Sequence, residues 1–206
     1  MSDKQKQERR YRRTEKMILD GLTTLLQSKS IKEISVRELS DLVDINRSTF
    51  YLHYADIYDL LEKTEERLFA ELSNAVENDW EGQHNPDNFF KFLQHTFRIL
   101  AENAPLCSAL IGPNGDIAFL RTIETMMRDE GMKTLRSFVP KEIGEQDLQY
   151  AISFSLAGCM GLVERWLRNG CTETPTHMAE LSLILLREGT SSIGVPSVKL
   201  QRHEIS

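Results

Sequence analysis

Apolar residues recur at three- and four-residue spacing along most of the chain, and this periodicity constrains its fold more than any other feature. In the first such stretch, from about Gln7 to Ser28, Ile18, Leu22, Leu25 and Leu26 share one helix face. Proline and glycine fall almost entirely between the periodic stretches, and no stretch alternates apolar and polar residues as a half-buried strand does. The sequence therefore predicts an all-α protein.

The remaining helices follow from the same pattern. Two very short helices are expected before Tyr54, and a long helix is expected from near Asp56 to Gly82. Residues 191–206 show no usable periodicity and are expected to form a disordered tail. Further helices are predicted over residues 86–103, 106–111, 116–138, 145–169 and 175–188.

Composition and cysteine content narrow the class of protein. Of the 206 residues, 40% are hydrophobic, which is enough to bury a core and excludes disordered and fibrous chains. The three cysteines, Cys107, Cys159 and Cys171, form no C-x-x-C pair, so neither a disulfide framework nor a cysteine-rich zinc site is supported. The N-terminus is too polar for a signal peptide, and the longest charge-free stretch, Leu148–Val163, is shorter than the roughly 20 residues of a membrane span. We expect a cytoplasmic protein without a membrane segment.

The formal net charge of −6 argues at first against nucleic acid as a partner, because DNA affinity comes largely from lysine and arginine. The charge is unevenly distributed, however. Residues 1–63 hold 12 basic and 11 acidic residues, and the first sixteen hold seven basic and three acidic residues. The chain therefore has a basic N-terminal arm, which contains Arg9, Arg10, Arg12 and Arg13, and an acidic body. A plain solvated terminus is the alternative reading of the arm.

Residues 35–54 contain two helix starts eleven residues apart. Ser35, with Glu38 three residues later, forms a capping-box pattern, and Asn46 is a second N-cap. Asp44 stands where the chain turns between them, at a position where a left-handed conformation costs aspartate less than most residues. Ile45 and Phe50 can pack the second helix on the first. The pattern predicts a helix-turn-helix.

This arrangement leaves hydrogen-bond donors and an aromatic ring pointing away from the core, and these are side chains that suit DNA bases and phosphates. No aspartate or glutamate occurs in residues 45–54. The outward-pointing residues are Arg47, Ser48, Thr49, Tyr51 and His53.

Residues 10–65 resemble the DNA-binding domain of the tetracycline-repressor (TetR/AcrR) family of bacterial transcription regulators. The resemblance is carried by the helix containing Ile18 and Leu22, by the Ile34-Ser35-Val36 entry, by the Thr-Phe-Tyr-x-His-aromatic run at residues 49–54 and by Asp59-Leu60-Leu61. Three positions depart from the family pattern. Asp44 replaces a usual glycine and Gly21 a frequent alanine, both of which are tolerable. Ile57 replaces a lysine that commonly reaches a phosphate, which puts one DNA contact in doubt.

The resemblance implies a three-helix helix-turn-helix domain over residues 8–64 and a helical ligand-binding and dimerisation domain over residues 65–190, with about nine helices in all. It further implies a homodimeric repressor that binds a palindromic operator in double-stranded DNA and is released by a small-molecule effector. The DNA-binding residues that it implies are Ser35, Arg37, Asn46, Arg47, Ser48, Thr49, Tyr51, His53 and Tyr54, of which Tyr54 can equally be a core residue.

The C-terminal half suggests a dimer interface. Small residues four apart on one stripe let another backbone approach closely, and with the last helix they form a plausible four-helix interface, as in the family. Ordinary packing within the chain is the alternative. The residues assigned to this interface are Ser153, Ala157, Gly161, Trp166, Leu181 and Leu185.

An effector pocket is expected among apolar and aromatic side chains of the middle helices, although the same residues are equally typical of a core. Its candidate lining residues are Phe89, Phe92, Leu93, His95, Phe97, Leu110, Phe119, Ile123 and Met127.

Two other functions are alternatives to that of a DNA-binding repressor. A protein-binding coactivator that has lost its DNA contacts has only Ile57 as mild support. An enzyme of the di-iron helical-bundle type needs two Glu-x-x-His pairs, whereas this chain has one, Glu81-x-x-His84, which Gly82 interrupts. No Ser-His-acid set or glycine-rich phosphate loop occurs either. We therefore expect no catalytic residue, metal or cofactor.

Overall fold

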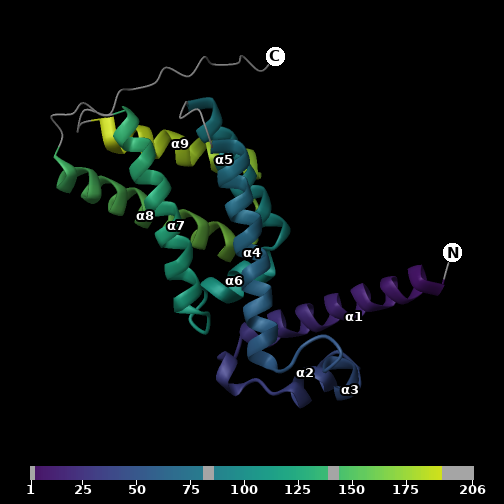
Figure 1. Cartoon of the computed structure of the whole chain (residues 1–206). Coiled ribbons are helices and arrows are strands. Elements are labelled where there is room, and N and C mark those ends of the chain that lie inside the picture. Colours follow the sequence, from purple (N-terminus) through teal and green to yellow (C-terminus); the bar gives the residue numbers. More distant parts are fainter. Residues whose placement is uncertain (1–2, 81–85, 139–143, 192–206) are drawn as a thin grey trace. The chain divides into compact units, whose positions relative to one another are not determined.

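The computed structural model describes residues 3–80, 86–138 and 144–191, and every regular element within these ranges is helical (Figure 1). The chain divides into two compact units. The first consists of Met1–Ala70 and Pro105–Leu120, and the second of Glu71–Ala104 and Arg121–Ser206. The prediction of an all-α fold is confirmed. No helix in the described ranges has the length and apolar character needed to cross a membrane.

The first unit is built on a long N-terminal helix and two short ones. It contains α1 (Asp3–Leu26), the 3-10 helix η1 (Ile31–Glu33), α2 (Val36–Leu42), α3 (Arg47–Phe50) and the start of α4 (Ile57–Trp80). It also takes in most of α6 (Ala104–Ile111) and the start of α7 (Ile117–Phe138). Its core is formed by fully buried apolar side chains from four helices, namely Ile18, Leu22, Leu39, Phe50 and Leu60.

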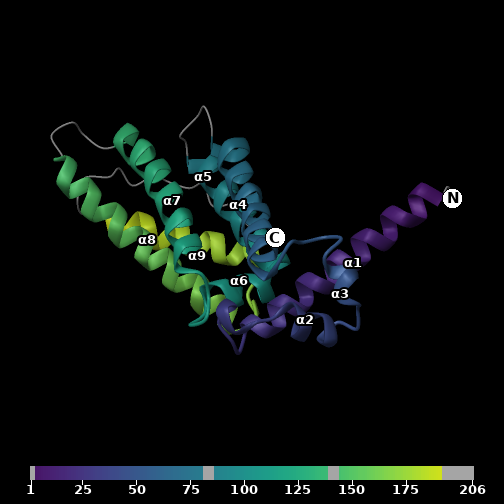
Figure 2. The same cartoon turned by 60° about the horizontal axis from the view of Figure 1, so that its bottom comes forward.

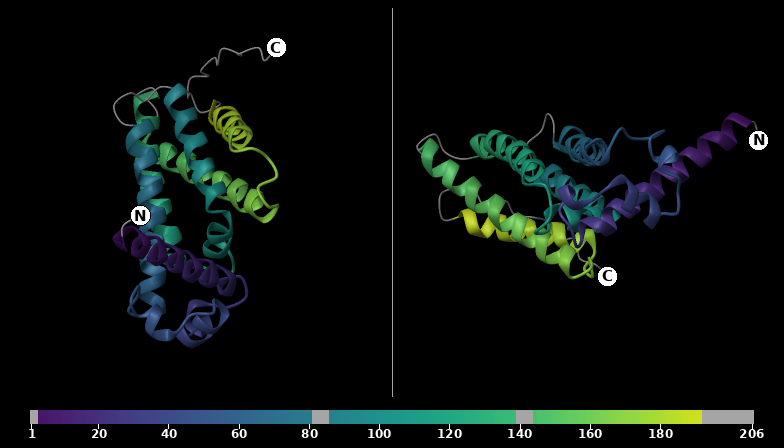
Figure 3. Two further views of the ribbon diagram at one scale, coloured as in Figure 1. Left: turned by 90° about the vertical axis from the view of Figure 1, so that its right-hand side faces the viewer. Right: turned by 90° about the horizontal axis from the view of Figure 1, so that it is seen from below.

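The second unit contains the rest of α4 and α7 together with α5 (Pro86–Glu102), α8 (Glu145–Arg168) and α9 (Pro175–Ser191). Figures 2 and 3 show α8 and α9 running beside each other. Helix α5 packs against α9, and Gln94 Nε2 donates a hydrogen bond to Thr176 Oγ1 at 2.8 Å between them. The ring of Phe97 meets Trp166 edge-on, with 5.3 Å between the ring centroids.

The helices agree with the periodicity except at their ends. Helix α1 begins at Asp3 rather than near Gln7, so the basic arm is itself helical, and the sequence did not indicate η1. The predicted helix end at Gly82, the Glu81–His84 pair and the predicted tail from residue 192 onward lie outside the described residues. The domain boundary between residues 64 and 65 stays a prediction.

Gly21 allows α1 and α2 to come unusually close together. A Cβ atom at this position would lie 2.4 Å from Val43 Cγ1 and 2.8 Å from Leu39 Cδ1, which is closer than real contacts allow. A larger residue here would force the side chains of Val43 and Leu39 to move. The turn that follows α2 uses Asp44 at φ 53°, the left-handed conformation that the sequence predicted for this residue.

Glu65 on α4 is a half-buried acid in the first unit. Its Oε1 atom is buried and has no hydrogen-bond partner. Burial, assisted by the negative charges of Asp116 and Glu62, raises the pKa of Glu65 to about 7. The folded unit therefore binds a proton at this carboxyl at pH values where the unfolded chain has already released it.

We expect Gly21→Ala to lower the free energy of unfolding by about 1 kcal/mol or more, because overpacking at Val43 outweighs the gain in helix propensity. Urea unfolding of the purified protein measures this. In a Val43→Ala background the same substitution should cost less, because only the contact with Leu39 Cδ1 then remains. Gly131→Ala on α7 is a matched control, since its nearest neighbour would lie 3.7 Å away. Equal stability of Gly21→Ala and Gly131→Ala would contradict the steric explanation.

We expect stability to fall as pH rises from about 4.5 to about 7, because the folded state binds more protons than the unfolded state in that window. Glu65→Gln should flatten this slope and raise the free energy of unfolding at pH 8 by about 1 kcal/mol, a figure discounted for solvent screening of a half-exposed group. Urea unfolding at pH 5 and pH 8 checks it, with exposed Glu66→Gln as the control. If the free energy of unfolding changed equally with pH in Glu65→Gln and in the unmodified chain, Glu65 would not titrate as proposed.

Candidate nucleic-acid interface

Side-chain caps fix the starts of both short helices. Ser35 Oγ accepts a hydrogen bond from the Glu38 backbone N–H at 3.1 Å. Asn46 Oδ1 accepts hydrogen bonds from the Ser48 backbone N–H at 2.9 Å and from the Ser48 hydroxyl at 3.0 Å. Both predicted N-caps are confirmed. These caps hold α2 and α3 in the geometry of a helix-turn-helix.

A capping box also needs the Glu38 side chain to accept a hydrogen bond from the Ser35 backbone N–H, and this part of the prediction is wrong. The Glu38 carboxylate forms an ion pair with Lys29 Nζ instead of returning to the Ser35 backbone. A reciprocal arrangement occurs one element earlier, where the Glu33 carboxylate accepts from both the backbone N–H (2.9 Å) and the hydroxyl (2.8 Å) of Ser30. The Lys29 amine, nine residues away from Glu38, was not visible to a local pattern.

Helix α3 is a single turn that buries one side of itself. Phe50 is fully buried, whereas Arg47, Ser48 and Tyr51 are exposed and Thr49 is partly exposed. The exposed face carries the side chains that the sequence placed there, without an acid among them. Leu52, just after the helix, is also strongly exposed, and sequence reasoning missed it because it occupies the variable position of the family pattern.

Tyr54 lies in the core and is not an exposed contact. Only 3% of its surface is accessible. Its hydroxyl donates to Glu15 Oε1 at 3.3 Å and accepts from Arg67 Nη2 at 3.0 Å, while Arg67 Nη2 also lies 2.9 Å from Glu15 Oε1. Burial raises the pKa of Tyr54. The assignment of Tyr54 as a DNA-binding residue is therefore corrected, because its hydroxyl joins α1 to α4.

Ile57 is a core residue as well, with 4% of its surface exposed. The start of α4 around it is acidic, since Asp56 Oδ1 accepts from the backbone N–H groups of Tyr58 (2.8 Å) and Asp59 (2.9 Å). Asp59 Oδ2 accepts from the Ala55 N–H at 2.8 Å. Carboxylates thus occupy the donors of this helix start, which leaves a poor environment for a phosphate.

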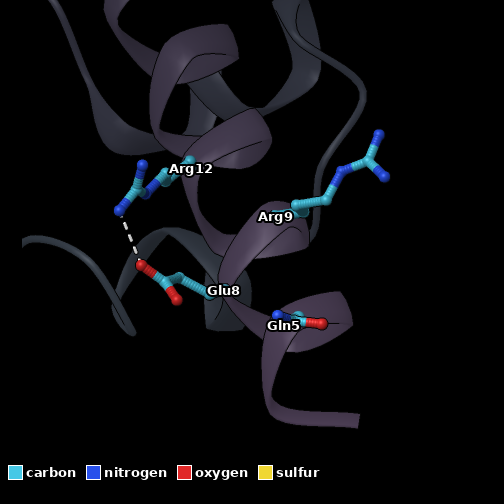
Figure 4. A pocket seen from close by; sticks show the side chains of 4 residues that line it. All are labelled: Gln5, Glu8, Arg9 and Arg12. Carbon is cyan, nitrogen blue, oxygen red and sulfur yellow. Dashed lines mark hydrogen bonds and ion pairs between the residues drawn. The ribbon is translucent and has the colours of Figure 1, made fainter. Parts of the chain in front are cut away.

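The basic arm forms the N-terminal half of α1. Arg12 pairs with Glu8 at 2.6 Å, and these two residues line an open surface pocket with Gln5 and Arg9 (Figure 4). Lys6, Arg10 and Arg13 follow each other at four- and three-residue spacing and therefore share one face of the helix. On α2, Arg37 Nε lies 3.7 Å from Asp41 Oδ2, and both side chains are well exposed.

His53 lies directly after α3 and is stacked against Tyr11 of α1, with 4.0 Å between ring centroids and 26° between ring planes. Its Nδ1 atom is buried and has no hydrogen-bond partner. Burial lowers the pKa of His53, although the charge of Glu15 opposes this shift. The imidazole is therefore predominantly neutral at pH 7.

The residues assigned to an effector pocket divide between the two units. Leu110 and Phe119 are buried in the first unit. In the second unit, α5 carries Phe92, Leu93 and Phe97 as buried residues and Phe89 and His95 as partly exposed ones, and α7 carries the partly exposed Ile123 and Met127. Within the described ranges, no three histidine, cysteine or carboxylate side chains come together as a metal site requires.

The residues assigned to a dimer interface separate into exposed and buried ones. Ser153, Ala157, Gly161 and Leu185 are exposed and Leu181 is partly exposed. Trp166 is 2% exposed, and its Nε1 donates to the Glu173 carbonyl at 3.0 Å. Because Trp166 is enclosed by its own chain, it offers no surface to a partner. Sequence reasoning did not assign Tyr150, which is exposed on α8, or Ile184, which is exposed on α9.

Comparisons with known proteins agree with this geometry. A family model of the TetR type, described as a transcriptional regulator C-terminal region, matches residues 87–188. A comparison with curated protein sequences gives no match.

Solved structures similar to the chain include a putative TetR-family transcriptional regulator from Syntrophomonas wolfei, which is 18% identical over 91% of this chain and 99% of that one, with a TM-score of 0.63. The fatty acid degradation regulator FadR from Bacillus halodurans is 13% identical over 84% and 93% of the two chains, with a TM-score of 0.63. FadR from Bacillus subtilis, solved in complex with stearoyl-CoA, is 15% identical over 89% and 98%, with a TM-score of 0.60. At these identities the likeness is one of fold.

Proposed function

The chain belongs to the tetracycline-repressor family of transcriptional regulators, and on that basis we propose that it is a homodimeric repressor that binds a palindromic DNA operator and is released by a small-molecule effector. One observation carries the DNA-binding part. The capped α3 helix presents Arg47, Ser48 and Tyr51 on an exposed face that contains no acid. Arginine and hydroxyl side chains are suited to base edges and phosphates.

The remaining assigned DNA contacts have different roles in this proposal. Asn46 shapes the start of α3, and Ser35 does the same for α2, so both act mainly by holding the helices. Arg37 and Thr49 remain candidate contacts, as does His53. Tyr54 is left out of the proposed contacts because it is buried. The face of α1 with Lys6, Arg10 and Arg13 supplies further positive charge for phosphates.

An exposed apolar face on α8 and α9 supports the dimer. Phe154 is 70% exposed, and Tyr150, Ile184 and Leu185 also lie open. Nothing approaches within 4 Å of a Cβ atom built at Gly161, so a partner backbone can come close there. Large exposed apolar side chains of this kind favour an interface, and a second copy of the chain covers them by twofold symmetry. Two copies also supply the two half-sites that a single-turn recognition helix requires.

The effector part of the proposal rests on the apolar side chains of α5 and on the relatives. An effector with a long apolar tail is favoured, because Phe92 and Phe97 are buried aromatics and a structurally similar FadR is solved with stearoyl-CoA. The alternative remains that these side chains are solely core. A coactivator without DNA contacts is the second candidate function, and it is favoured by the buried Ile57 and by the acidic start of α4.

We expect Arg47→Ala and Tyr51→Ala each to weaken binding to a palindromic duplex by about tenfold or more, because each removes an exposed contact of α3. The duplex is recovered from a random library with the unmodified protein, and affinity is measured across a salt series. Arg47→Ala should also reduce, by about 1, the magnitude of the slope obtained when the logarithm of the association constant is plotted against the logarithm of the salt concentration. Arg121→Ala, an exposed arginine of the second unit, is the charge-matched control.

Unchanged affinity in both α3 variants would show that the recognition helix is misassigned. Recovery of no duplex from the library would favour the coactivator instead. Repeating the DNA-binding titration in the presence of stearoyl-CoA tests whether this effector releases the protein from the duplex. A DNA affinity that does not change with this probe would remove acyl-CoA from the proposal.

We expect Ala157→Glu to weaken self-association by at least about 100-fold, because it places a charge in a proposed apolar interface while the residue is exposed in the monomer. Sedimentation equilibrium measures the dimer, and thermal unfolding confirms that the fold is kept. Thr125→Glu on α7 places the same charge at another exposed small residue and should leave association unchanged. A monomeric unmodified protein at micromolar concentration, or an unaffected Ala157→Glu dimer, would refute this interface.

A further inference from the structure

We propose that Tyr11 is a positioning residue for DNA recognition, which holds the imidazole of His53 in a fixed plane beside α3 and thereby also ties the basic half of α1 to the recognition helix. This inference rests on the proposed DNA-binding function. Tyr11 lies seven residues, or about two helical turns, before the fully buried Ile18, so it continues the core-facing side of α1 beyond the core itself.

The geometry of the pair shows a specific contact. The two rings are stacked at 4.0 Å and 26°, although Tyr11 remains 46% exposed and has no other ring contact within the described part of the chain. Nearly parallel stacking at this distance restricts rotation of the His53 imidazole about its two side-chain bonds. Tyr11 and His53 are 42 positions apart in the chain, so the contact joins the arm to the residue that follows α3.

The stacking has a chemical consequence for His53. Its buried Nδ1 has no acceptor, and an N–H enclosed without an acceptor is costly, so the proton of the neutral ring is favoured on Nε2. The groups that face the ring are Tyr11, Tyr54 and the carboxylate of Glu15, and that carboxylate is already paired with Arg67. His53 therefore presents a neutral N–H donor, which suits a phosphate oxygen without adding a cation to the interface.

The test follows the His53 imidazole of the full-length protein by NMR, first without DNA. The signal is assigned by its loss in His53→Gln. We expect the unmodified protein and Tyr11→Phe to titrate together, below the ordinary histidine pKa of about 6.5, and Tyr11→Ala to titrate closer to that value. Tyr58→Ala removes another exposed tyrosine of the same unit and should leave the titration unchanged.

The second measurement is affinity for the selected palindromic duplex at pH 6 and pH 8. Tyr11→Ala should bind about 3- to 10-fold more weakly at pH 8 and gain a pH dependence, whereas Tyr11→Phe should stay within about twofold of the unmodified protein. In a His53→Gln background, Tyr11→Ala should not weaken binding to the duplex any further.

Three results would overturn the proposal. An unchanged His53 titration in Tyr11→Ala would show that stacking does not control the imidazole. A further tenfold loss in the His53→Gln background would show that Tyr11 acts by another route. A shifted titration without binding of any duplex by the unmodified protein would refute the proposed function while leaving the Tyr11–His53 contact established.

Discussion

The first unit depends on a buried hydroxyl. Helices α2 and α3 are too short to be stable alone, so their positions must come from packing against longer helices. Tyr54 provides the polar centre of that packing, because its hydroxyl meets Glu15 of α1 and Arg67 of α4 within hydrogen-bond distance. The buried Tyr54 hydroxyl would be costly without partners, and the partly exposed Glu15 and Arg67 satisfy it. Helix α3 is linked to the same centre by Phe50, whose ring centroid lies 5.9 Å from that of Tyr54.

Much of the fold could be predicted from the sequence, because the signals concerned are local. Helical periodicity, the caps at Ser35 and Asn46 and the left-handed Asp44 all depend on residues within one or two turns. The errors concern contacts between distant segments. Glu38 binds Lys29, Tyr54 binds Glu15 and Trp166 is enclosed beside Phe97, and in each case the partner lies nine or more residues away. An amphipathic side chain such as tyrosine suits a core or a surface equally well until its partners are known.

The candidate site illustrates the same limit. Its residue types could be predicted, since Arg47, Ser48 and Tyr51 lie exposed as expected, whereas the roles of their neighbours could not. Ile57 departs from the family pattern, and the structure gives it a physical role: it fills the core where carboxylates cap the start of α4. The net charge of −6 is likewise a sum over dissimilar parts, and only the basic face of α1 and the acid-free face of α3 bear on contact with a polyanion.

The hydrogen bond from the Ser48 hydroxyl to Asn46 Oδ1 limits the hydrogen bonds that this serine can form with another molecule. A hydroxyl has one proton, and in this cap that proton is already engaged, so only its lone pairs remain available to another molecule. In the major groove the complementary groups are the amino groups of adenine and cytosine, whereas guanine O6, thymine O4 and phosphate oxygens offer no donor. In the proposed complex with DNA, the cap that shapes the helix would therefore leave the Ser48 hydroxyl able only to accept a hydrogen bond, which favours contact with the amino groups of adenine or cytosine.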